Sequence, residues 1–199
     1  RHPVIQSTSP LGILGHESGF SPDGNTLWIS TTSQAGVTAI DVSDPKLPSI
    51  LWHSTDYTFH GMNLNADGTR LYGSDIGESG LTILDVSDIQ KRAANPQVRK
   101  VSFLTWPEVS IPQNTIPVTI KGRKYLVEFD EYARNVGSYT ADDAVGAARI
   151  IDIQDERHPR VGLHRLPQRP GDRLVLGLAD VVWIPAVDHS DVQRDPGVE

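Results

Sequence analysis

Two histidines recur at the same place in a repeated unit, and they are the residues of this chain best suited to chemistry. His60 follows His16 by 44 residues, and an Asp-Gly turn follows each at the same distance. Imidazole is the commonest metal ligand in proteins, and equivalent residues of a ring of repeats converge on one axis. Counting back eight residues from the turn glycine of the later units leads to Asn114 and to the neighbour of His164. We therefore expect an axial site for a divalent metal ion from His16, Glu17, His60, Asn114 and His164. The alternative is that the histidines only hydrogen-bond neighbouring repeats.

A second group of candidates lies in an extension of the third unit, near residues 130–143. Clustered carboxylates suit Ca²⁺, but their spacing matches no EF-hand loop, and a solvated acidic rim is the favoured interpretation. Because long loops in compact domains are often functional, we expect a binding loop that contains Glu128, Asp130, Glu131, Tyr132, Arg134, Tyr139, Asp142 and Asp143.

Other chemistries are excluded by composition and by missing motifs. The chain has no cysteine, so disulfides and thiolate sites are absent. Its net charge of −7, without a basic cluster, argues against nucleic acid as a partner. No apolar run approaches the roughly 18 residues of a membrane helix, and we expect no transmembrane segment. Residues 15–19 resemble a nucleophile elbow, but the serine is out of place and no helix follows.

The elements that position these residues follow from the repeat. Residues 37–44 recur as residues 81–88 and, less closely, as residues 148–155, each ending in an aspartate-rich turn. In the first unit we expect strands at residues 17–20, 26–31, 36–41 and 49–53, joined by tight turns. The chain is thus predicted to be all-β, a single β-propeller domain over residues 1–199 with about four blades of four antiparallel strands. The units are residues 16–59, 60–104, 111–162 and 163–199.

Smaller features complete the prediction. The aspartates of the signature, Asp41, Asp85 and Asp152, are expected to bind backbone amides at strand ends, and Asp44, Asp88 and Asp155 to cap turns. Residues 91–94 are predicted to form one helical turn. Residues 2–8 resemble an outer strand that completes the last blade or belongs to a preceding one. This match of the ends favours a closed ring of four blades over a fragment of a ring of six or seven.

The three signature copies, each followed by a proline-containing outer strand, resemble the LVIVD-repeat family. The resemblance covers most of residues 16–165. The family consists of bacterial and archaeal proteins, often at the cell surface, that are thought to form β-propellers. The resemblance implies a secreted or cell-surface location, and it implies no settled chemistry.

Two functions remain open at this point. The first is an exported binding or scaffold module, not an enzyme, that presents its channel mouth and the loop of the third unit to an unknown protein or small-molecule ligand. The alternative is a metal-dependent propeller enzyme, a lactonase-like hydrolase or a lyase, with its ion held at the axis by histidine. A filled coordination sphere around His16 and His60 would separate the two.

Overall fold

The fold consists of three four-stranded antiparallel sheets. The computed structural model describes residues 2–8, 11–33, 36–106, 111–131 and 147–165. The first sheet comprises β1 (Glu17–Phe20), β2 (Thr26–Ser30), β3 (Val37–Asp41) and β4 (Ser49–Ser54). The second comprises β5 (Phe59–Leu64), β6 (Arg70–Asp75), β7 (Gly80–Asp85) and β8 (Arg99–Leu104). The third comprises β9 (Pro112–Ile120), β10 (Arg123–Asp130), β11 (Ala147–Asp152) and β12 (Arg160–Arg165).

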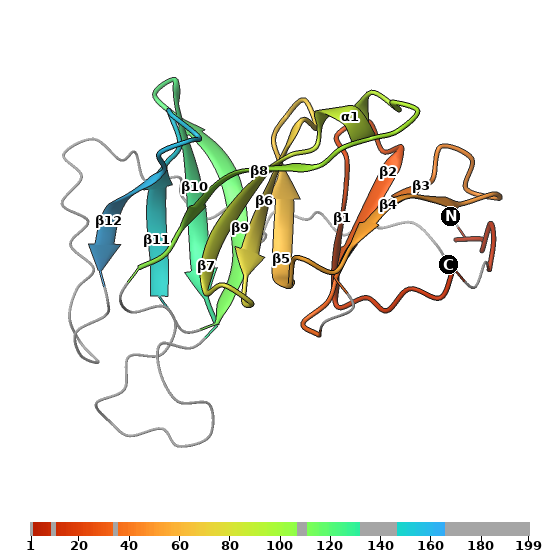
Figure 1. Ribbon diagram of the computed structural model, residues 1–199, viewed down its shortest axis with the longest axis horizontal. Coiled ribbons are helices and arrows are strands. Elements are labelled where there is room, and N and C mark those ends of the chain that lie inside the picture. The colour runs from red at the N-terminus through yellow and green to blue at the C-terminus, as the bar shows by residue number, and fades with distance from the viewer. Residues whose placement is uncertain (1, 9–10, 34–35, 107–110, 132–146, 166–199) are drawn as a thin grey trace, which may run out of the picture.

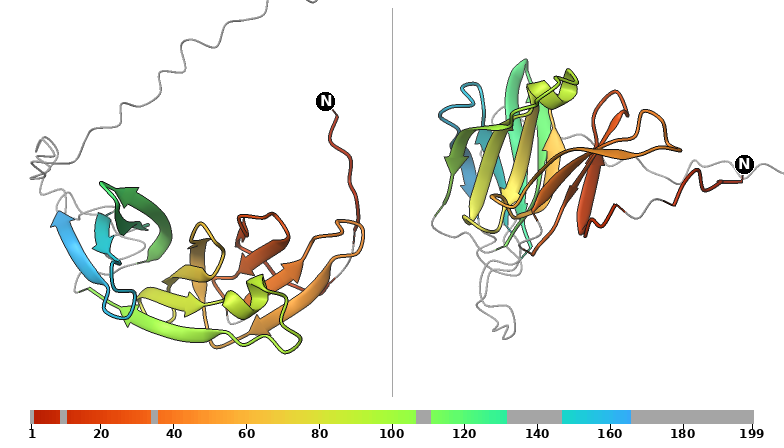
Figure 2. Two further views of the ribbon diagram at one scale, coloured as in Figure 1. Left: turned by 90° about the horizontal axis from the view of Figure 1, so that it is seen from above. Right: turned by 45° about the vertical axis from the view of Figure 1, so that its right-hand side comes forward.

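The sheets lie side by side along the long axis of the molecule, with the second between the other two (Figure 1). Seen from above they follow a curve, and the described residues do not close it into a ring (Figure 2). The all-β prediction and the strands of the first unit are therefore confirmed, whereas the number of blades stays a prediction. The fourth unit, residues 163–199, lies outside the described residues except for the end of β12. In the described part of the chain, no helix is long and apolar enough to cross a membrane.

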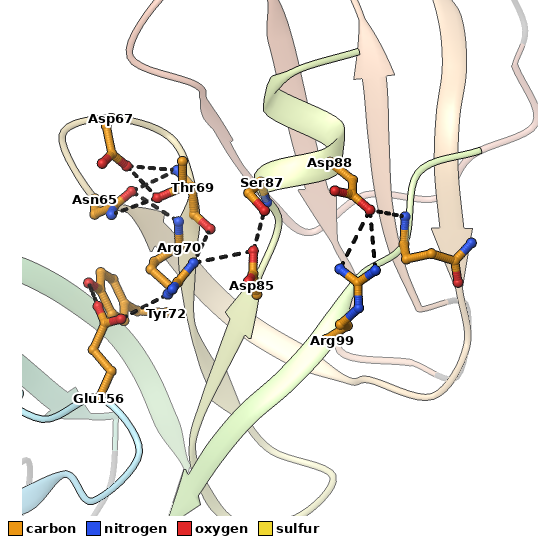
Figure 3. Close-up of polar contacts among 11 residues, drawn as sticks. Asn65, Asp67, Thr69, Arg70, Tyr72, Asp85, Ser87, Asp88, Arg99 and Glu156 are labelled. Carbon is orange, nitrogen blue, oxygen red and sulfur yellow. Dashed lines mark hydrogen bonds and ion pairs between the residues drawn. The ribbon is translucent and has the colours of Figure 1, made fainter. Parts of the chain in front are cut away.

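The repeated aspartates have the structural role that the sequence predicts. The backbone N–H of Ser87 donates to Oδ1 of Asp85 at 3.0 Å (Figure 3). Ser43 and Gln154 make the same bond to Asp41 and Asp152 at 2.9 Å. Each aspartate thus ends a strand and satisfies the backbone of the following turn. The capping prediction is confirmed for Asp44 and Asp155, which accept from the N–H groups of Lys46 and Arg157 two residues later. Asp88 instead lies in α1 and accepts from the N–H of Gln97, nine residues later.

One short helix lies between β7 and β8 of the second sheet, and it comprises different residues from those predicted. Helix α1 (Ser87–Gln90) begins directly after the signature aspartate, whereas the sequence suggested residues 91–94. The N–H of Lys91 closes the helix on Ser87 O at 3.0 Å, and Arg92 then adopts a φ of 56°. This left-handed conformation ends the helix before residues 93–94 can join it.

Two apolar clusters hold the sheets against one another. Between the first and second sheets, Trp28 and Phe59 are buried against Leu84. Between the second and third, Tyr72, Trp106 and Leu126 form the corresponding layer. The sheets therefore stack through side chains that alternate along their strands, which is what the period-two hydrophobic pattern requires.

Polar contacts join the sheets at the end where the signature turns lie. Arg92, after α1, donates to Thr26 Oγ1 at 2.7 Å and to Asn25 O at 2.8 Å in the first sheet. Glu156, after β11, accepts from Nε of Arg70 and from the hydroxyl of Tyr72, both at 2.8 Å, in the second sheet (Figure 3). The second and third sheets thus each extend one charged residue from the region of the signature turn to the preceding sheet, and the residue is an arginine in the first case and a glutamate in the second.

Candidate metal centre

The first strands of the three sheets converge, as the propeller interpretation requires. Strand β5 contacts both β1 and β9. Asn63 in β5 donates from Nδ2 to Asn114 Oδ1 and to Thr115 O in β9, both at 2.9 Å. At Gly61, an added Cβ would lie 2.4 Å from Gln113 O and 2.6 Å from Glu17 Oε2. The absence of a side chain at Gly61 therefore permits the close approach of three strands at this point.

Three of the predicted metal ligands meet beside Gly61. One ligand atom from each of His16, Glu17 and His60 can be chosen so that all three lie within 4.8 Å of one another. The imidazole rings of His16 and His60 are edge-to-face, with centroids 4.6 Å apart. His16 is exposed, Glu17 is partly exposed and His60 is buried, so the set opens to solvent on one side. The prediction that the repeated histidines converge is confirmed.

The buried ring of His60 has a carboxylate near each nitrogen. Its Nδ1 lies 3.4 Å from Oε1 of Glu17, and its Nε2 lies 3.3 Å from Oε2 of Glu131. The strand register shifts between Phe59 and Met62, and such a bulge re-aims the side chains it contains. Nδ1 is buried and has no hydrogen-bond partner. An unpaired buried polar atom is unusual, and here it faces the Glu17 carboxylate in a group of metal-ligating side chains.

This donor set suits a divalent transition metal with an open coordination position. Two imidazoles and one carboxylate are a ligand set of catalytic zinc sites, where a water fills the fourth position. Nitrogen donors favour Zn²⁺, Co²⁺ or Ni²⁺ over Ca²⁺ and Mg²⁺, which prefer oxygen. The residues present can therefore hold a metal ion and leave it accessible from the side of His16.

Asn114 lies next to this set but is occupied by other contacts. Its Oδ1 accepts from Asn63 Nδ2 at 2.9 Å and from the N–H of Thr115 at 2.8 Å. Asn114 pairs with Phe129 in the third sheet, and Glu17 pairs with Ser30 at the equivalent position of the first sheet. Gln113, and not Asn114, is therefore the residue of the third sheet that corresponds to His16. The count from the turn glycine fails because Lys121 and Gly122 form a two-residue turn with positive φ, unlike the longer loop at Gly24.

The backbone places His164 on the edge strand of the third sheet, at a distance from the strands that carry His16, Glu17 and His60. It belongs to β12, where its backbone pairs with Arg149. The sheet order β12-β11-β10-β9 puts β12 at the edge opposite β9, which contacts β5. The fourth strand of this sheet continues through Arg165, so His164 is part of that strand and does not open a new first strand.

The predicted acidic loop divides into three parts. The side chains of Glu128 and Asp130 are fully buried and bind Nη1 of Arg149 at 2.8 and 2.9 Å, so the interpretation of a solvated rim is wrong for them. Glu131 is partly exposed and reaches His60. The remaining residues of the predicted loop lie outside the described residues, namely Tyr132, Arg134, Tyr139, Asp142 and Asp143.

The buried cluster of Glu128, Asp130 and Arg149 was not predicted from the sequence. Burial and the charge of Asp130 raise the pKa of Glu128 to about 8, although Arg149 opposes this. The guanidinium of Arg149 also lies 4.6 Å over the ring of Trp106. Two features of the sequence could have indicated this cluster. Period-two alternation places Glu128 and Asp130 on one face of β10, and Arg149 is the one basic residue in the otherwise apolar start of β11.

A groove of about 480 Å³ lies elsewhere, between the second and third sheets. Tyr72, Val118 and Tyr125 line it, together with Asp67 and Lys124 near the turns between the strands. None of the three metal-set residues lines this groove. A substrate of the metal centre would therefore bind outside it.

Comparisons with known proteins give no family. No family model matches the chain, and a search of curated proteins finds no relative. The resemblance to the LVIVD-repeat family and the cell-surface location that it implies stay predictions.

Solved structures with a partly similar fold do exist. A protein of Bacteroides uniformis, provisionally assigned as a 6-phosphogluconolactonase, has a TM-score of 0.49 at 19% identity, over 76% of this chain and 38% of that one. The periplasmic gluconolactonase PpgL of Pseudomonas aeruginosa has a TM-score of 0.43 at 15% identity, over 75% and 56%. Hydrazine synthase of Kuenenia stuttgartiensis has a TM-score of 0.40 at 18% identity, over 75% and 49%. The chain thus spans little more than half of these proteins at most, and such distant similarity does not identify an activity.

Proposed function

We propose that this chain is part of a β-propeller that binds a divalent transition metal ion through His16, Glu17 and His60. The observation that carries the proposal is the buried Nδ1 of His60, which makes no hydrogen bond and lies 3.4 Å from Glu17 in a set of three candidate ligands. A buried nitrogen that makes no hydrogen bond costs free energy, and a bound metal ion would remove that cost.

We further propose that the centre is hydrolytic, with carboxylic esters, lactones included, as the substrate class. A metal ion with this ligand set lowers the pKa of the water it binds and polarises a carbonyl. In the reaction, the oxygen of water adds to the acyl carbon, the acyl–oxygen bond breaks, and a proton passes to the leaving alkoxide. The exposed His16 supports access of a substrate from solvent.

The binding-module hypothesis has less support among the described residues. Two residues of its predicted loop, Glu128 and Asp130, are buried and bound to Arg149, so they present no surface to a partner. Glu131 is directed to His60. These contacts tie the described part of the loop to the interior and to the proposed metal centre.

Elemental analysis tests the metal before any activity is sought. The chain is purified without chelator, soaked with Zn²⁺ or Co²⁺ and desalted. We expect about one ion per chain, as for a mononuclear site, and loss of that ion in His16→Ala, whose exposed ring can be removed without opening the core. His53→Ala is the matched control, because His53 lies in β4 and bonds only Thr38 among the described residues. If the native chain retains no ion after soaking, the metal centre is refuted.

Activity is then measured with the loaded chain on a chromogenic ester and on a simple lactone. We expect turnover that requires the ion and is lost in His16→Ala. A loaded chain that hydrolyses neither substrate would leave the metal site standing and would refute the hydrolytic function.

A further inference from the structure

We infer that Glu131 is a positioning residue for the metal centre, which it completes from the third sheet. In this role its carboxylate accepts a hydrogen bond from Nε2–H of His60 and thereby leaves Nδ1 free to bind the ion. The inference rests on the proposed metal centre, and it adds a residue that contributes no ligand atom to the three-residue set.

The first argument is the direction of the two nitrogens of His60. A neutral imidazole carries one proton, and only the nitrogen without it can bind a metal ion. Nδ1 faces Glu17, which belongs to the ligand set, whereas Nε2 faces Oε2 of Glu131 at 3.3 Å. A metal ion on Nδ1 therefore requires the ring proton to be on Nε2, and the Glu131 carboxylate is placed to accept a hydrogen bond from this N–H.

The second argument is the way in which Glu131 is held. Its backbone N–H donates to Ile111 O at 2.8 Å, just before β9. The preceding residue, Asp130, is anchored by Arg149 Nη1 at 2.9 Å, and both of these side chains are fully buried. The register of β9 and β10 shifts between Phe129 and Asp130, a bulge that redirects the chain at this point. Glu131 is thus fixed at the end of β10 by contacts of its neighbours, and its carboxylate points toward the second sheet.

The third argument is chemical. Histidines that bind metals almost always donate their second N–H to a carboxylate, a carbonyl or water, and removal of that acceptor weakens metal binding about 10- to 100-fold. The carboxylate fixes the tautomer, orients the ring and makes the ligand nitrogen more basic. His60 with Glu131 has this arrangement, and the side chain of His60 is only 9% exposed, so few other acceptors can reach Nε2.

The same geometry has a rival explanation that needs no metal. A doubly protonated His60 could form ion pairs with both Glu17 and Glu131, since a carboxylate lies near each nitrogen. The two explanations differ in the number and place of the protons on the ring. They also differ in the effect of Glu131 on metal affinity, so both quantities must be measured.

The first experiment measures Co²⁺ affinity of the full chain by competition with a chromophoric chelator. Glu131→Ala is expected to weaken binding about 10- to 100-fold, and Glu131→Gln, which retains an acceptor oxygen, to weaken it less. Glu78→Gln is the control, because Glu78 is exposed, pairs with Lys100 and does not belong to the three-residue set. Unchanged Co²⁺ affinity in Glu131→Ala would overturn the inference while leaving the proposed metal site intact.

The second experiment needs no metal. Long-range ¹H–¹⁵N correlation spectra of the metal-free chain at pH 8, with His60 assigned through His60→Gln, report which ring nitrogen carries the proton. We expect the proton on Nε2 in the native chain and a shift toward Nδ1 in Glu131→Ala. A proton on Nδ1 or on both nitrogens in the native chain would overturn the inference. If the native chain binds no Co²⁺, the proposed function fails and the positioning role of Glu131 is overturned with it, whereas Co²⁺ binding that is unchanged in Glu131→Ala overturns the role of Glu131 alone.

Discussion

Nδ1 of His60 lies 3.4 Å from Oε1 of Glu17, although the two residues belong to different sheets. Glu17 lies at the start of β1, and His60 occupies the bulged start of β5. The contact exists because the first strands of neighbouring sheets approach one another at Gly61. The proposed ligand set therefore lies at the junction of two repeats, where each repeat contributes a histidine and the first contributes the carboxylate.

The role of Glu17 is tested by Glu17→Gln, which keeps the shape of the side chain and removes its charge. A neutral amide is a poorer ligand for a divalent ion, so we expect Co²⁺ affinity to fall by at least about 10-fold. The measurement is competition with a chelator, with circular dichroism as a check on the fold. Equal affinity in the variant and the native chain would exclude Glu17 as a ligand.

The buried pair Glu128 and Asp130 predicts a dependence of stability on pH. The pKa of Glu128 is raised from 4.5 to about 8 in the folded chain, first by burial and then by the charge of Asp130. Between these two values the folded chain holds a proton that the unfolded chain has released. The free energy of unfolding should therefore fall as the pH rises from about 4.5 to about 8, by an amount on the order of a few kcal/mol.

Glu128→Gln isolates this effect. The amide keeps an acceptor for Arg149 and cannot ionise, so the variant should lose much less stability between pH 5 and pH 8 than the native chain. Urea denaturation at both pH values measures the difference. Glu78→Gln, at an exposed position, should behave like the native chain. The raised pKa is refuted if Glu128→Gln and the native chain show the same pH dependence.

Gly61 is predicted to be intolerant of any side chain. A Cβ at this position would lie 2.4 Å from Gln113 O, which is backbone and cannot move aside cheaply. We expect Gly61→Ala to lower the free energy of unfolding by about 1–3 kcal/mol, as overpacking does, and to displace Glu17 from the metal set. Gly19→Ala is the control, since its Cβ would meet Met62 O at an ordinary 3.8 Å. Thermal unfolding of both variants provides the test, and equal melting temperatures would contradict the prediction.

The contact of Glu156 with the second sheet should contribute measurably to stability. Its carboxylate is partly buried and accepts from both Arg70 and Tyr72 (Figure 3). Charge-assisted hydrogen bonds of this kind are worth about 1.5–3 kcal/mol, so Glu156→Ala should destabilise the chain by roughly this amount. Glu78→Ala, which breaks a surface pair with Lys100, should cost less than about 1 kcal/mol. A similar cost for both substitutions in urea denaturation would contradict the role of Glu156.

Much of the local structure follows from the sequence by itself. Alternating apolar residues set the strands, and Asp-Gly and the signature aspartates set the turns, because their preferences act within a few residues. The bonds from Ser43, Ser87 and Gln154 to the signature aspartates show this most directly. The repeat also indicated that His16 and His60 are equivalent, and hence that they would converge.

The composition of the site was decided by tertiary structure. Glu131 reaches His60 from another sheet, and Arg149 draws Glu128 and Asp130 into the interior. The spacing of the sequence put His164 near the start of a new unit, whereas its backbone continues β12, the edge strand of the third sheet, through Arg165. Contacts between residues distant in the chain depend on strand register and on the stacking of sheets, and a single tight turn at Gly122 shifts that register. Periodicity in the sequence fixes which residues share a face, but only the packed sheets determine which faces meet.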